Sequence, residues 1–424
     1  EIPKRDWSSD VCSSDLLSTY RRIRQCGYKT KSQWHTKVMT EGVKSFPLAE
    51  LHKRKSAKWR RFPADVLPLP IAEMDFDIAE PMKAALRDMI DRSDTGYLGS
   101  FPGSFPELFE AFADFARERW SWKIEPENMR IATDVGVGAV EVIRTLIGPG
   151  EKLMMSSPVY DNMWNWVKEL RAELVDAPLK ESSMSYSLDL EAIEAGYRSG
   201  VKVHLLCNPH NPVGRVHSLE DLTALATLAV KYGVIVVSDE IFAPLTYPES
   251  RFVPFLSVSD EARSCGITLT SASKAFNLAG LKCAMIITGN QALKERINVM
   301  PVTVASRASL FGAVAANAGF RESREWLDRC ILTLDQNRHL LKNLIESKLP
   351  AVGYRIPDFG YLAWLDLSAL NLGDDPCATI LERGKVGLNS GSMYGPRHGS
   401  FGRFNFGTSA EIVTEGVDRI IRAL

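Results

Sequence analysis

Short apolar runs alternate with amphipathic stretches through most of the chain. Strand-like runs occur at residues 152–155, 173–175, 201–207, 234–238, 266–270 and 283–288. Stretches with a helical period separate most of them, as at residues 138–147, 159–170 and 219–232. The strand-like runs show no apolar–polar alternation, which indicates burial on both faces. The pattern predicts an α/β fold in which helices cover a mostly parallel sheet.

The pattern changes after Thr303. A helical region runs to about Leu349 and is interrupted near Gly319. Strand-like runs at 360–366 and 402–406 then indicate a smaller α+β unit. We therefore expect three parts after the leader: an N-terminal segment that joins the small domain (39–84), a large domain (85–318) and a small C-terminal α+β domain (319–424).

Residues 1–38 do not follow this pattern. The tetrapeptide at 8–11 is echoed at 13–16, and no apolar segment of the kind found in signal peptides is present. The basic stretch 20–37 lacks a clear apolar period, and a nucleic-acid-binding arm is the alternative explanation for it. We favour an artefactual or disordered leader and expect the natural chain to begin at Met39.

Composition narrows the class of protein. Of 424 residues, 45% are hydrophobic and 24% charged, as in ordinary globular proteins. The net charge of -1 creates no field toward nucleic acid or an anionic membrane, and no apolar run could span a bilayer. The seven cysteines form no CxxC pair. Buried thiols in a reducing, cytoplasmic compartment explain them better than disulfides or a metal site.

Three strand ends carry polar residues in a suggestive order. Asn211, Asp239 and Lys274 each follow a predicted strand. This set suits a pyridine cofactor, because the amine can bond a carbonyl, the carboxylate can meet a ring nitrogen and the amide can meet a ring oxygen. Each residue alone has a plainer explanation: Asn211 as a turn residue before proline, Asp239 as a helix cap, and Lys274 as a surface lysine.

As an ordered set, these motifs resemble those of fold-type I pyridoxal-phosphate enzymes, the aspartate aminotransferase superfamily, from Phe46 to Leu424. The runs 70–76 (PIAEMDF) and 96–97 resemble the branch of bacterial cystathionine β-lyases and cysteine-S-conjugate β-lyases. The resemblance implies a three-layer α/β/α fold with a seven-stranded sheet. It also implies pyridoxal 5′-phosphate as the cofactor and no metal.

The same resemblance assigns roles around the cofactor ring. Lys274 would hold the cofactor covalently and shuttle the Cα proton, because desolvation keeps its amine partly neutral. Asp239 would pair with the pyridine nitrogen, and Asn211 would donate to the 3-hydroxyl oxygen. Tyr160 would stack on the ring. Arg403, on a late strand, would clamp the substrate α-carboxylate.

The cofactor phosphate would lie at a helix N-terminus. Its implied ligands are the backbone amides of Gly136 and Val137 and the side chains of Ser271, Ser273, Lys282 and Tyr97. Lys282 stands where many relatives carry arginine and would act as a point charge. Tyr97 would come from the neighbouring subunit, which implies a homodimer with shared active sites.

One departure from the family pattern concerns the ring oxygen. Three residues after Asp239, many relatives carry tyrosine or histidine, and this chain has Phe242, which has no donor. Asn211 would then hold the oxygen alone. The exact activity is correspondingly open.

Two activities on small amino-acid substrates share their first steps. A β-lyase breaks the C–S bond of cystathionine or a related conjugate and gives a thiol, pyruvate and ammonia. An aminotransferase moves the amino group to a 2-oxo acid. The run 74–76 favours the lyase. The Ser-x-x-Lys at 271–274 also matches penicillin-recognising enzymes, but their Lys-Thr-Gly triplet is absent. A ligand-sensing regulator would need a DNA-binding domain, and the leader is poorly patterned for one.

Overall fold

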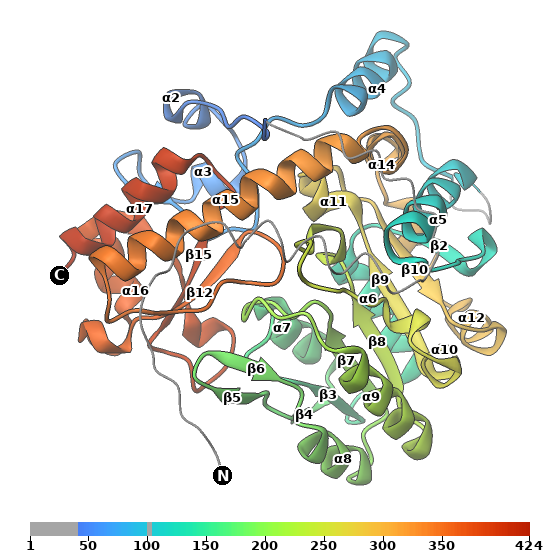
Figure 1. Ribbon diagram of the computed structural model, residues 1–424. Coiled ribbons are helices and arrows are strands. Elements are labelled where there is room, and N and C mark those ends of the chain that lie inside the picture. The colour runs from blue at the N-terminus through green and yellow to red at the C-terminus, as the bar shows by residue number, and fades with distance from the viewer. Residues whose placement is uncertain (1–40, 100–103) are drawn as a thin grey trace, which may run out of the picture. The chain divides into compact units, whose positions relative to one another are not determined.

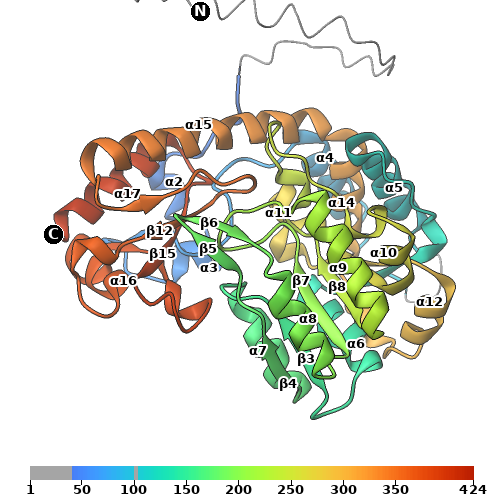
Figure 2. The same ribbon diagram turned by 60° about the horizontal axis from the view of Figure 1, so that its bottom comes forward.

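The structure, a computed structural model, describes residues 41–99 and 104–424. The leader expected at 1–38 and the expected start at Met39 therefore lie outside the described residues. Figure 1 and Figure 2 show a large sheet with helices on both sides and a smaller sheet beside two long helices. None of the described helices is both long and apolar enough to cross a membrane.

The large sheet has seven strands in the order β2-β10-β9-β8-β7-β3-β4. Their bounds are β2 Met129–Ala132, β3 Lys152–Met155, β4 Glu173–Asp176, β7 Val203–Cys207, β8 Ile235–Asp239, β9 Gly266–Thr270 and β10 Ala284–Thr288. Every pairing from β4 across to β9 is parallel, and β10 runs antiparallel to both of its neighbours. The predicted mostly parallel sheet is confirmed.

Alternate strand residues pack on opposite faces of this sheet, which explains the absence of polar alternation. Leu153 and Met155 belong to the core that contains α6 and α7, whereas Met154 packs with residues of α8 and α9. The helices of the large part are α4 Glu80–Asp91, α5 Pro106–Trp120, α6 Val135–Leu146, α7 Asp161–Leu170, α8 Leu190–Arg198, α9 Leu219–Tyr232, α10 Asp260–Cys265, α11 Ala272–Ala275, α12 Gln291–Ile297, α13 Thr303–Ser306 and α14 Leu310–Glu322. The result is the predicted three-layer α/β/α arrangement.

The small part is an antiparallel sheet in the order β11-β12-β15-β14, covered by α15 and α17. Its elements are β11 Gly353–Tyr354, β12 Leu362–Asp366, β14 Asn389–Ser390, β15 Phe401–Asn405, α15 Arg324–Lys348, α16 Pro376–Thr379 and α17 Ala410–Arg422. The N-terminal segment, with α2 Leu48–Leu51 and α3 Ala57–Arg60, joins this part through parallel pairing of β1 Leu67–Pro68 with β13 Val386–Gly387. The division at 318/319 falls inside α14 and stays a prediction.

Three local expectations differ from the structure. Strand β2, Met129–Ala132, was not recognised, because Arg130 interrupts its short apolar run. Helix α6 begins at Val135 rather than Gly138, since Asp134 caps it and its two glycines lie within the first turn. The break in the late helical region falls at Ser323 rather than near Gly319, because Gly319 is used inside α14 for close packing against the Phe276 ring.

Candidate active site

Most of the predicted site residues line one cavity of about 840 Å³ between the two sheets. This volume is typical of a small-molecule site. The predicted residues on its wall are Gly136, Val137, Tyr160, Asn211, Asp239, Ser271, Ser273, Lys274, Lys282 and Arg403. Tyr97 is the exception: its side chain is 95% exposed and it does not line the cavity of the single chain.

Lys274 lies on α11, directly after β9, where a strand end and a helix start deliver its side chain to the cavity. Its Nζ donates a hydrogen bond to the carbonyl oxygen of Ala72 at 3.0 Å and lies 5.9 Å from the centre of the Phe242 ring. Burial, and after it the positive charge of Arg403, lower the pKa of Lys274 to about 8. The amine is therefore partly neutral near physiological pH, as a nucleophile requires.

Asp239 is the last residue of β8 and is buried. Its Oδ1 accepts a hydrogen bond from the backbone amide of Ile241 at 3.1 Å, so the carboxylate also closes the turn after the strand. Burial raises the pKa of Asp239 to about 6, and the Ile241 amide and Lys274 oppose that shift. A buried carboxylate without a strong cationic partner can stabilise a cation placed in the cavity.

Asn211 and Arg403 meet although 192 residues separate them in the chain. Arg403 is on β15, and its Nη1 donates to Oδ1 of Asn211 at 3.1 Å. Its guanidinium also lies 4.9 Å from the centre of the Tyr394 ring. Arg403 Nε is buried without a partner among the described residues. The guanidinium is thus fixed at the cavity wall with a donor left to use.

The other end of the cavity carries groups that can bind an anion. The first turn of α6 presents its backbone amides there, and Asp134 caps them by accepting from Val137 N at 2.8 Å. Lys282 Nζ lies 2.8 Å from the other oxygen of Asp134. Ser271 Oγ donates to Cys283 O at 2.6 Å. Asp134 was not predicted as a site residue, although aspartate before a helical run is a recognisable cap signal.

Aromatic side chains form part of the wall between these two ends. Tyr160 precedes α7, and its hydroxyl accepts from Asn162 Nδ2 at 2.8 Å. Phe242 packs against Tyr361, with ring centres 5.8 Å apart. Tyr361 was not predicted, and its hydroxyl donates to Ala72 O at 3.0 Å, the same oxygen that Lys274 binds. A flat ring in the cavity could therefore pack against these aromatic side chains and leave its own polar atoms free for other partners.

Residues 70–75, here called the strap, belong to the site although the sequence indicated them only as a family motif. Side chains of β15 bind the carbonyl groups of the strap. Arg403 Nη2 donates to Pro70 O at 3.0 Å, and Asn405 Nδ2 donates to Glu73 O at 2.8 Å. The strap is thus tied to the strand that carries the predicted substrate clamp.

The strap is also tied to the segment that carries Lys274. Besides the bond from Lys274 to Ala72 O, Asn277 binds both polar groups of the Met74 backbone. Its Oδ1 accepts from Met74 N at 3.0 Å, and its Nδ2 donates to Met74 O at 2.8 Å. The strap consequently bridges the amine in the large part and the guanidinium in the small part.

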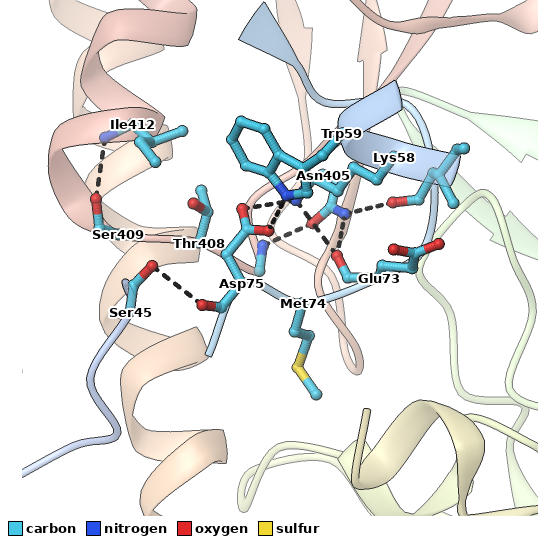
Figure 3. A network of polar contacts seen from close by, with 12 residues as sticks. Ser45, Lys58, Trp59, Glu73, Met74, Asp75, Asn405, Thr408, Ser409 and Ile412 are labelled. Carbon is cyan, nitrogen blue, oxygen red and sulfur yellow. Dashed lines mark hydrogen bonds and ion pairs between the residues drawn. The ribbon is translucent and has the colours of Figure 1, made fainter. Parts of the chain in front are cut away.

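A buried ion pair holds the end of the strap (Figure 3). Asp75 is fully buried, and its two carboxylate oxygens accept from Lys58 Nζ and Trp59 Nε1, each at 2.8 Å. The Lys58 side chain is equally buried. Both donors lie on α3. The partly exposed Arg54 lies 3.7 Å from the same carboxylate, so Asp75 is held by one buried and one partly exposed cation.

The donor set fits the phosphorylated pyridine cofactor expected from the sequence. Amides of α6, Ser273 and Lys282 can meet a phosphate, Asp239 a ring cation, and the Lys274 amine a carbonyl carbon. The absence of a side chain at Gly136 lets the Trp166 ring pack against the first turn of α6, since a Cβ there would lie 3.2 Å from that ring. Across residues 41–99 and 104–424, no cluster of three or more His, Cys, Asp or Glu side chains could hold a metal ion.

Comparisons with known proteins agree with this geometry. A cystathionine β-lyase of Corynebacterium glutamicum is 35% identical over 385 residues, covering 89% of this chain and all of that protein. A Mycobacterium tuberculosis protein, provisionally named a cystathionine β-lyase, is 38% identical over 411 residues, covering 89% and 98%. The solved PLP-bound C–S lyase of Staphylococcus hominis superposes with a TM-score of 0.80 at 25% identity, covering 87% and 95%.

The family assignment comes from a match between a family model and most of the chain. The model of the family described as aminotransferase class I and II matches residues 64–420, which include both sheets and all the residues that line the cavity except Arg61. The chain belongs to the class I and II aminotransferase family.

Proposed function

We propose that this protein is a pyridoxal-phosphate-dependent C–S lyase that cleaves cystathionine or related cysteine S-conjugates to a thiol, pyruvate and ammonia. The observation that carries the proposal is the grouping of Lys274, Asp239 and Arg403 around one cavity. Relatives named cystathionine β-lyase and C–S lyase along nearly their whole length support it.

The cofactor is pyridoxal 5′-phosphate, and when bound it supplies an electron sink for the pair left at the substrate Cα. Lys274 would attach to it and later remove the Cα proton, for which a pKa of about 8 is suited. Arg403 would keep its bond to Asn211 and exchange its bond to Pro70 of the strap for the substrate α-carboxylate. Asp239 would hold a positive charge in the ring, and Tyr160 would pack on the ring face.

We place the phosphate at the α6 end of the cavity. The Gly136 and Val137 amides, the hydroxyls of Ser271 and Ser273, and Lys282 would contact it. Lys282 is already oriented toward that position by Asp134. The absence of a donor on Phe242 leaves the 3-hydroxyl oxygen to Asn211.

The test separates the two activities of this family. Purified protein is incubated with L-cystathionine in one reaction, and with an amino acid plus 2-oxoglutarate in another. We expect pyruvate and a thiol in the first and little glutamate in the second. Lys274→Ala should lose both the product and the absorbance band of the attached cofactor. Glutamate formation without thiol release would contradict the lyase assignment.

We also propose a cytoplasmic homodimer in which Tyr97 reaches the phosphate of the neighbouring subunit. The exposure of Tyr97 in the single chain supports this arrangement, and the buried free thiols of the described cysteines suit a reducing compartment. Mixing inactive Lys274→Ala and Tyr97→Ala subunits tests it. Random exchange should restore about a quarter of the sites, because half the dimers are hybrids with one complete site. No recovery after proven exchange would place Tyr97 outside the partner's site.

A further inference from the structure

The cavity wall carries two opposite charges that the proposed cofactor does not use. Arg61 follows α3, and Asp161 is the first residue of α7. Both line the same cavity as Lys274 and Arg403. Arg61 is exposed, and its guanidinium lies 5.6 Å from the centre of the Phe62 ring. Among residues 41–99 and 104–424, neither the Arg61 nor the Asp161 side chain has a hydrogen bond or ion pair. Each charge is therefore available to a ligand.

Arg61 lies on the wall formed by the small part. The neighbouring Phe62 ring packs so closely on Gly387, in β13, that a Cβ there would collide with it. Two residues further, Asn389 lines the cavity and pairs in register with Arg403. Arg61 thus belongs to the end of the cavity that holds the predicted α-carboxylate clamp. Figure 2 shows α3 beside the small sheet.

Asp161 lies on the wall formed by the large part, next to Tyr160. Its charge reaches the reacting centre: burial chiefly lowers the pKa of Lys274, and Asp161 is among the carboxylates that oppose the shift. Burial raises the pKa of Tyr394, whose ring contacts Arg403, and Asp161 adds to that shift. Asp161 therefore lines the cavity within electrostatic reach of the amine and of the Tyr394 ring beside the clamp, and it comes from the large part, whereas Arg61 comes from the segment that joins the small part.

The other charged residues of the wall have partners or belong to the phosphate end. Lys282 pairs with Asp134, and Glu141 and Glu169 both pair with Arg144. Arg307 belongs to the phosphate end, because it follows α13, and the Val304 carbonyl of α13 accepts a hydrogen bond from Thr133 beside the start of α6.

We propose that Arg61 and Asp161 bind the far end of the substrate, and that these two residues let the cavity distinguish a thioether whose leaving group is itself an α-amino acid from one whose leaving group is uncharged. The guanidinium would take the distal carboxylate and the carboxylate would take the distal ammonium. This rests on the proposed function, since Arg403 must already hold the near carboxylate. A leaving group without charges would bring no partner for either residue, and its binding would not depend on them.

Matched substrates test the proposal. Steady-state kinetics are measured with L-cystathionine, which has the distal amino acid, and S-ethyl-L-cysteine, which lacks it. We expect Arg61→Gln and Asp161→Asn each to raise the KM for cystathionine about 10-fold or more, with kcat little changed. Their KM for S-ethylcysteine should stay within about twofold of wild type. Arg60→Gln, the exposed neighbour outside the cavity, is the control and should change neither value.

A binding measurement separates failure of this proposal from failure of the lyase assignment. The dissociation constant of L-cystathionine is measured by calorimetry on cofactor-loaded Lys274→Ala, alone and combined with Arg61→Gln. A matching loss of about 10-fold supports the distal site even if the wild-type protein turns over neither thioether. Equal losses with both substrates, or no loss of cystathionine binding, would overturn it. Melting temperatures of all variants show whether the fold is intact.

Discussion

The Arg403 guanidinium donates a hydrogen bond to the side-chain oxygen of Asn211 at 3.1 Å, across the boundary between the two sheets. This bond fixes the orientation of the amide, because the oxygen must face the guanidinium. The Asn211 amide nitrogen is then the atom that can donate to a ring oxygen of the cofactor. One contact therefore sets the position of the substrate clamp and the polarity of a cofactor contact.

Replacing Arg403 with another side chain should weaken substrate binding more than it slows the chemical step. Arg403→Lys keeps the charge but loses the fork that meets a carboxylate with two bonds. We expect the KM for cystathionine to rise about 10- to 100-fold, and Arg403→Gln to be worse. Steady-state kinetics measure this, with the exposed Arg251→Gln as control. An unchanged KM in Arg403→Gln would remove this residue from substrate recognition.

The buried pair that anchors the strap should be a large contributor to stability. Lys58→Met removes the fully buried cation and leaves the Asp75 carboxylate with the partly exposed Arg54, 3.7 Å away, so the free energy of unfolding should fall by about 3 kcal/mol. Adding Asp75→Asn removes the charge and keeps an acceptor for Trp59, so the double variant should recover part of the loss. Urea unfolding of the four proteins of this cycle gives the coupling between the two residues. Additive losses would mean that the charges do not depend on each other.

The sequence predicted the residues at strand ends because parallel strands present their carboxyl ends at the same sheet edge. Asp239 is the last residue of β8, and Asn211 and Lys274 follow β7 and β9; the three strands are neighbours in the observed order. Short polar motifs after buried strands were therefore sufficient to predict that these three residues lie close together.

The strap could not be predicted as part of the site in the same way. Its contribution comes from backbone carbonyls, which every residue possesses, so no residue type marks them. The bond from Lys274 to Ala72 joins positions 202 residues apart and depends on how the N-terminal segment returns across the fold. Tyr97 illustrates a second limit, since its predicted contact requires another subunit and stays a prediction.

The buried Glu240, next to Asp239 in the chain, should make the free energy of unfolding depend on pH. Its Oε1 accepts from Phe255 N, Ser238 Oγ and Asn208 Nδ2, and burial raises the pKa of Glu240 to about 8. The folded protein keeps a proton that the unfolded chain releases above about 4.5. The free energy of unfolding should consequently fall as pH rises toward 8.

Glu240→Gln should flatten this dependence. Between about pH 6.5 and about pH 8, wild type should lose about 1–2 kcal/mol more than the variant. Burial lowers the pKa of His204 and His210 to about 3 and that of His217 to about 4, and these histidines contribute equally to both proteins, so their effect cancels in the difference. Urea unfolding at three pH values measures the slope. Parallel slopes for the two proteins would mean that Glu240 is ionised in the fold.

The rate at which Lys274 reacts with added pyridoxal phosphate should depend on pH in the way expected for a buried amine. Burial lowers its pKa from 10.5 to about 8, and Arg403 is the next contributor. Only the neutral amine attacks a carbonyl, so the rate of capture of added pyridoxal phosphate should rise with pH and level off above about 8. Arg403→Gln removes a nearby positive charge and should move the inflection to higher pH. Stopped-flow absorbance on cofactor-free protein measures both curves. An inflection near 10.5 in wild type would mean that the amine is as well solvated as a free lysine, which would contradict the buried site.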